Sequence, residues 1–166
     1  MNDEKRNTPV SDTSTKVMLN AAFLSEIKED NVQFKLLIAS TADALRVDAV
    51  IRPRMFAELL SNLRDAIETY FALEEFYGYI EHSKAVNPQV STRAQKLRDQ
   101  HQTLYLELNG LIEETERLVY HEVPHGRSMP ELIAGFFNFY EAFQSHEEEE
   151  MELVMRLSNE EIGVGD

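Results

Sequence analysis

Apolar residues recur along most of the chain at alternating steps of three and four positions, the pattern of helices with one buried face. This pattern predicts four helices, over about residues 16–46, 53–82, 91–120 and 129–158. Short connections between long helices favour antiparallel neighbours. The expected fold is therefore all-α, an up-down-up-down antiparallel four-helix bundle.

The ends of the predicted helices carry recognisable signals. Pro53 suits the first turn of the second helix, and Asn87-Pro88 is expected to end that helix. Ser91 or Thr92 can cap the third helix, and Ser128 with Glu131 resembles a capping box that opens the fourth. Residues 1–15 are interpreted as a flexible N-terminal tail, 16–158 as one bundle domain, and 159–166 as a C-terminal tail.

The inward face of each predicted helix is apolar except at one place. The exceptions are Asn31 on the first helix, Tyr70 and Glu74 on the second, His101 on the third, and His146 and Glu150 on the fourth. Burying a carboxylate or an imidazole costs several kcal/mol unless the group is paired or bound to a cation. A bound metal ion would remove that cost.

These polar positions are also expected to share one level of the bundle. In an antiparallel bundle, residues at one level lie about equally far from the loop that joins their helices. Asn31 and Tyr70 are balanced about a loop near residue 50, and Glu74 and His101 about the second connection. His101 and His146 are balanced about a third near residue 125. The sequence thus predicts a single polar layer.

Each residue of this layer also has an ordinary interpretation. A lone histidine such as His101 is more often a hydrogen-bonded core residue than a ligand. His146 and Glu150 strengthen the ligand interpretation because four-residue spacing lets both side chains reach one centre. The flanking residues Glu147, Glu148 and Glu149 are interpreted as a solvated face. Glu75 is expected to be exposed or to reach the rim of the site, and Tyr70 and Tyr105 can be core tyrosines with a satisfied hydroxyl.

Composition narrows the chemistry. The chain has no cysteine, so a metal would be held by His, Glu, Asp, Tyr or Asn. A net charge of -14 over 166 residues argues against nucleic acid and anionic membrane surfaces as partners. The longest uncharged apolar stretch, 132–140, is too short to span a bilayer, and the polar N-terminus lacks a signal peptide, so a cytoplasmic location is expected. No phosphate-binding glycine loop or nucleophilic triad stands out.

Three segments carry a resemblance to a known family: FLSEIKEDNVQF (23–34), YFALEEFYGY (70–79) and HEEEEMEL (146–153). In these segments the chain resembles the hemerythrin-like HHE cation-binding family. Members of that family usually form a non-haem di-iron centre that binds dioxygen or senses oxygen or iron. The resemblance implies metal ligands at Glu74, His101, His146 and Glu150.

The chain departs from that family pattern at three positions. Asn31 and Tyr70 stand where histidines of one metal are expected, and Tyr105 replaces a second histidine of the third helix. The other metal keeps its imidazoles. The resemblance therefore implies an altered centre, with Asn31, Tyr70 and Tyr105 as further candidate ligands.

The leading hypothesis is a divergent hemerythrin-like metal-binding protein with a mononuclear non-haem iron site, used in oxygen or iron sensing or in metal handling. Two iron ions, or manganese or zinc, remain alternatives, and dioxygen or a related small molecule is the expected partner. A second hypothesis is a metal-free structural or protein-interaction bundle with a vestigial site. A third, ranked last, is an oxidase in which Tyr70 donates an electron. Enzymatic activity is not the favoured interpretation.

Overall fold

The computed structural model describes the backbone of residues 21–47, 51–77, 88–120 and 126–163, with side chains for 32–47, 51–75, 88–120, 126–153 and 155–156. These residues form four helices, α1 (Ala21–Val47), α2 (Pro53–Tyr77), α4 (Pro88–Val119) and α5 (Met129–Gly163). The prediction of an all-helical fold is thus confirmed for the described part of the chain. None of the helices in this part is both long and apolar enough to cross a membrane.

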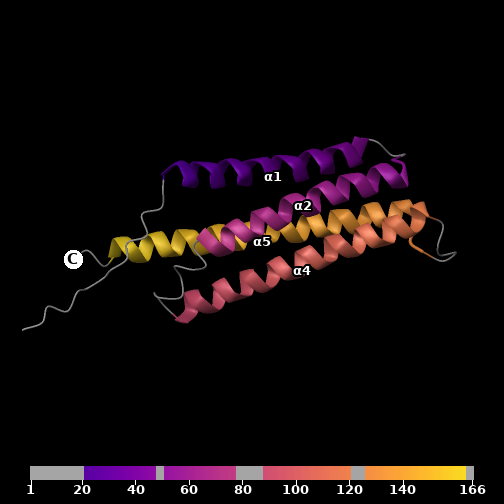
Figure 1. Ribbon diagram of the computed structural model, residues 1–166. Helices are drawn as coiled ribbons and strands as arrows, with labels where there is room; N and C mark the ends of the chain where they lie inside the picture. Colours follow the sequence, from indigo (N-terminus) through magenta and orange to yellow (C-terminus); the bar gives the residue numbers. More distant parts are fainter. Residues whose placement is uncertain (1–20, 48–50, 78–87, 121–125, 164–166) are drawn as a thin grey trace, which may run out of the picture.

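The four helices pack side by side along their lengths (Figure 1). The closest partners are α2 with α4 and α4 with α5, while α1 contacts both α2 and α5 more sparingly. Helix α1 also leaves Val32 and Leu36 more than half exposed. The molecule is therefore a four-helix bundle in which α1 is the least embedded helix.

Two helix boundaries differ from the prediction. Helix α4 begins at Pro88, so Thr92 lies inside the helix, where its hydroxyl donates to the Pro88 carbonyl at 2.9 Å. Proline is well suited to a first helical position because the N–H that it lacks has no partner there. Helix α5 continues to Gly163, beyond the predicted end near residue 158. The predicted start of the first helix at residue 16, the end of the second at 82 and the N-terminal tail lie outside the described residues.

The glutamate half of the predicted capping box is present at the start of the last helix. The Ser128 backbone N–H and hydroxyl both donate to Glu131 Oε2 at 2.7 Å, and the Leu132 N–H donates to the Ser128 carbonyl at 3.0 Å. The Glu131 carboxylate therefore satisfies donors that the first turn leaves free, and these two hydrogen bonds from Ser128 lower the pKa of Glu131. This cap defines where α5 begins.

The core of the bundle is divided by a polar layer. A small apolar cluster consists of Val90, Ala94, Leu97 and Leu153. A much larger one holds most of the buried aliphatic and aromatic side chains, among them Leu104, Leu108, Phe136, Phe139 and Phe143. Along α4, His101 lies between the two clusters, and along α5, His146 and Glu150 do so. The layer is thus a polar interruption of an otherwise apolar interior.

Candidate metal centre

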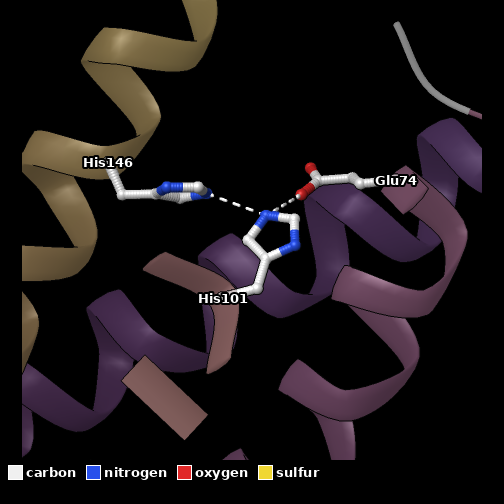
Figure 2. Close-up of side chains that lie close together, drawn as sticks. All are labelled: Glu74, His101 and His146. Atoms are coloured by element: carbon white, nitrogen blue, oxygen red, sulfur yellow. Dashed lines mark hydrogen bonds and ion pairs between the residues drawn. The ribbon is translucent and has the colours of Figure 1, made fainter. Parts of the chain in front are cut away.

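Two histidines from neighbouring helices meet at the polar layer. His101 on α4 and His146 on α5 are 3% and 1% exposed, and their Nε2 atoms are 3.1 Å apart. Glu74 on α2 directs its Oε2 atom to within 3.5 Å of His101 Nε2. Figure 2 shows the three side chains pointing toward one another from three helices. The structure thus brings together three of the predicted site residues.

Hydrogen bonds at the opposite ring nitrogens determine the histidine tautomers. His101 Nδ1 lies 3.0 Å from Glu75 Oε1, and His146 Nδ1 lies 2.9 Å from Gln100 Oε1. The Gln100 amide donates to Glu149 at 3.4 Å, so its oxygen faces the histidine. Since the carboxylate and the amide oxygen only accept, both Nδ1 atoms carry the proton. Each Nε2 atom therefore presents a lone pair to the interior.

The result is a convergence of two imidazole lone pairs and a buried carboxyl group. The two Nε2 lone pairs and the Glu74 carboxyl group face one another. A proton on an imidazole is disfavoured because burial lowers the pKa of both rings, that of His146 to about 4, with the neighbouring His101 lowering it further. Burial raises the pKa of Glu74, so a proton on this carboxyl can serve one of the two lone pairs, whereas a metal ion can bind both.

Two buried carboxyl groups complete the cluster. Glu74 and Glu150 are 6% and 7% exposed, and within the described residues Glu74 Oε2 and Glu150 Oε1 have no hydrogen-bond partner. Burial raises the pKa of both groups, and the charge of Glu150 raises that of Glu74 further. Ionising these two carboxyl groups costs free energy in the metal-free bundle, and a bound cation would offset that cost.

The spacing of the donor atoms fits a single ion. One ligand atom each from Glu74, His101 and His146 lie within 4.8 Å of one another, and so do atoms of His146, Glu147 and Glu150. Two donors that are each about 2.1 Å from one ion lie about 3.0 Å apart in octahedral and about 3.4 Å apart in tetrahedral geometry, which spans the 3.1 Å between the imidazole nitrogens. A donor set of imidazole nitrogens and carboxylate oxygens suits iron, manganese or zinc.

The interpretation of Glu147 as a solvated residue is wrong. Its side chain is only 16% exposed, accepts a hydrogen bond from the Tyr70 hydroxyl at 2.5 Å and forms an ion pair with Lys35 on α1. Position 147 is one turn after Phe143 and directly beside His146, so it flanks the buried face on the side of α1. Glu148 is exposed, as predicted, and Glu149 is partly buried against Lys96.

The other residues that the sequence singled out lie in or beside the polar layer where the structure describes them. Tyr70 is buried in the layer with its hydroxyl bonded to Glu147, as expected of a core tyrosine. Tyr105 is half-buried and lines a pocket of about 610 Å³ between α2 and α4, together with His101 and Glu75. Glu75 reaches the rim of the site, one of the two expectations for it. The side chain of Asn31 lies outside the described residues.

Sequence reasoning missed three residues around the histidines. Gln100 orients His146, Lys35 pairs with Glu147, and Phe71 stacks on His101 with ring centroids 4.0 Å apart and planes within 11°. Each is adjacent in sequence to a residue of the inward face: Gln100 to His101, Lys35 to Phe34, and Phe71 to Tyr70. Being one position away from an inward-facing residue was the only sign of these contacts in the sequence. Which of such flanking residues turn inward depends on their rotamers and on the neighbouring helices.

Comparisons of the chain with known protein families, with curated proteins and with solved structures found no match. The fold and the geometry of the site are therefore the basis for function. Together they define an all-helical four-helix bundle with a buried histidine–glutamate cluster.

Proposed function

We propose that this protein binds one transition-metal ion in the polar layer of its bundle, through His101, His146 and Glu74, with Glu150 as a fourth ligand. Three helices then contribute to one centre. The observation that carries the proposal is the convergence of two buried Nε2 lone pairs, 3.1 Å apart, with a buried carboxyl group beside them.

The surrounding hydrogen bonds support the same proposal. Metal-binding histidines commonly donate their second N–H to a carboxylate or carbonyl oxygen, which fixes the ring and increases its basicity. Here His101 has Glu75 in that role and His146 has Gln100. Gln100 is held in turn by Glu149, which pairs with Lys96 at 2.6 Å. Both imidazoles are thus oriented before any ion arrives.

The proposal includes the finer description of the fold and its kinship. We propose an up-down-up-down bundle, supported by the colour gradients of successive helices, which run in alternate directions in Figure 1. We also propose that the chain is a divergent hemerythrin-like protein, because Glu74, His101, His146 and Glu150 match that pattern. Among the metals that suit this donor set, iron agrees best with the resemblance.

Iron in this position would supply one-electron chemistry and an affinity for dioxygen or a related small molecule. The chain itself would hold the ion in a buried layer between two apolar clusters. Phe71 covers one face of His101, and both side chains line the pocket between α2 and α4. A centre so enclosed is better suited to sensing oxygen or iron, or to metal handling, than to turnover of a bulky substrate.

Metal content per chain tests the proposal. The full chain, expressed with iron available and without a metal-binding tag, is expected to contain about one metal ion by elemental analysis. His146→Ala is expected to lose it, and Glu150→Gln to weaken it. Glu148→Gln removes an equivalent charge from the exposed face of the same helix and should leave the content unchanged. A folded wild-type chain that takes up no iron, manganese or zinc would overturn the proposal.

A second candidate function is a metal-free structural or protein-interaction bundle. It is favoured by the Tyr70–Glu147 hydrogen bond and by the bonded Nδ1 atoms of both histidines, which need no ion. The unpartnered oxygens of Glu74 and Glu150 count against it. In this case Glu74 would be a member of a stabilising network, and its replacement would destabilise the protein.

A further inference from the structure

The Lys35 ammonium places a positive charge at the edge of the polar layer that faces α1. The Lys35 ammonium forms an ion pair with Glu147 Oε2, while the other Glu147 oxygen accepts the Tyr70 hydroxyl hydrogen. The same ammonium lies 5.8 Å from the centroid of the Tyr70 ring. Its side chain is 49% exposed, so the stem reaches in from the surface and the charge meets the layer at its edge.

Glu147 belongs to a second group of ligand atoms. Atoms of His146, Glu147 and Glu150 lie within 4.8 Å of one another, next to the group formed by Glu74, His101 and His146. Glu150 is more than nine-tenths buried, and its Oε1 atom has no hydrogen-bond partner within the described residues. The second group thus has the donor atoms of a cation position, but its outer carboxylate is already paired with Lys35.

We infer that the Lys35 ammonium is the resident cation of this second position and limits the centre to one metal ion. The inference rests on the proposed function, because it assumes that the first position takes a metal. Lys35 is then a residue that sets metal stoichiometry, rather than a ligand.

The charges of the cluster support this role. With a metal bound, the ionised carboxylates of Glu74, Glu147 and Glu150 carry about three negative charges. One divalent ion and one ammonium balance them. A second divalent ion beside Lys35 would leave a large positive excess in a layer that is poorly solvated. The other two carboxylates near the histidines have separate partners, since Glu149 pairs with Lys96 and Glu75 lies 3.8 Å from Arg98.

The test is the number of metal ions bound by Lys35 variants of the full chain. Chelator-treated protein is titrated with Mn²⁺ and with Fe²⁺ under anaerobic conditions, and bound metal is measured after gel filtration. Lys35→Met keeps the apolar stem and removes the charge, and Lys35→Gln repeats the test with a polar side chain. Lys35→Arg keeps a cation. Arg54→Met removes one positive charge from an exposed pair with Glu58 near the start of α2 and serves as the control.

The inference predicts one more bound metal ion per chain in Lys35→Met and Lys35→Gln than in the wild type. Lys35→Arg and Arg54→Met are expected to match the wild type. If the neutral variants fold, by circular dichroism, and bind no additional metal, the inference is overturned. The difference between variant and wild type decides it. A wild type that binds no metal would refute the proposed function and the inference with it, whereas a wild type with one ion and neutral Lys35 variants that also bind one would overturn the inference alone.

Discussion

Tyr70 on α2 donates its hydroxyl hydrogen to Glu147 Oε1 on α5 across 2.5 Å. The Tyr70 ring is 1% exposed and packs 5.0 Å from the Phe34 ring and 6.1 Å from the Phe143 ring. Burial, with the negative charge of Glu74, raises the pKa of this phenol far above its usual range. In the metal-free chain Tyr70 is therefore a neutral hydrogen-bond donor that joins two helices.

Replacing Tyr70 with Phe should test that assignment. The variant keeps the ring packing and loses one hydrogen bond to a charged group, so a loss of about 1–3 kcal/mol in the free energy of unfolding is expected. Tyr120→Phe, at a residue that is 71% exposed, should change stability by less than about 0.5 kcal/mol. Urea unfolding of the metal-free proteins measures both. Equal effects of the two substitutions would contradict a structural role for the Tyr70 hydroxyl.

Gln100 is expected to matter for metal affinity although it contacts no metal. Gln100→Leu removes the acceptor that orients His146 and fixes its tautomer. Loss of such a partner typically weakens metal binding about 10- to 100-fold. Gln102→Leu, on the same helix with an exposed side chain, provides the control. Competition with a chromogenic chelator gives both affinities, and a wild-type affinity in Gln100→Leu would show that His146 needs no such support.

The contribution of His146 to the stability of the metal-free chain should fall as the pH drops from about 6.5 to 4. The pKa of His146 is about 4 in the folded chain against 6.5 as the ordinary value, so the unfolded chain binds more protons in this window. The loss from this residue alone can reach about 3 kcal/mol. The wild type should therefore lose about this much stability relative to His146→Gln between pH 6.5 and pH 4. A stability difference between the two proteins that does not change with pH would contradict the assignment.

The buried carboxyls act in the opposite direction. The pKa values of Glu74 and Glu150 are raised above the ordinary 4.5, so their protonated forms stabilise the metal-free fold at low pH, and that contribution is lost as the pH rises through the raised values. A bound metal needs the ionised carboxylates. The increase in melting temperature on adding metal should therefore grow from acidic to mildly alkaline buffer. A constant increase across that range would exclude these carboxyls as ligands.

Glu74→Gln separates the two candidate functions. If the residue is a metal ligand, the substitution should change the stability of the metal-free protein at about pH 7 only slightly, because burial raises the pKa of Glu74 to about 9 and a neutral amide then replaces a neutral carboxyl group. The same variant should lose most of the metal-induced rise in melting temperature. If Glu74 is instead part of a metal-free network, the substitution should be destabilising with and without chelator. Thermal melts in both conditions distinguish the cases.

The helices and the meeting of their polar residues were predictable from the sequence because both depend on periodicity. Steps of three and four placed His101, His146, Glu74 and Glu150 on inward faces, and distances from the connections placed them at one level. The structure brings the four together at that level. Their role as ligands remains a prediction that metal analysis will test.

The immediate surroundings of the site could not be predicted in the same way. Glu147 and Gln100 are each one position from an inward histidine, which in a helix is a rotation of about 100°. Whether such a residue meets solvent or a neighbouring helix depends on the packing of α1 and α5. Lys35 illustrates the point, since its partner is more than a hundred positions away along the chain. The start of α4 at Pro88 reflects the preference of proline for the first position of a helix, which competes with capping by Ser91 or Thr92.

The polar layer between the two apolar clusters also has a consequence for how the helices find their alignment. If α5 slid by one helical turn along α4, His146 would face apolar residues of one cluster or the other, and His101 would lose its present partner. Each misplaced group would then be buried without a partner, at a cost of several kcal/mol. A bundle of uniformly apolar seams has no such penalty. The polar layer therefore favours one register of the packed helices, with or without a metal ion.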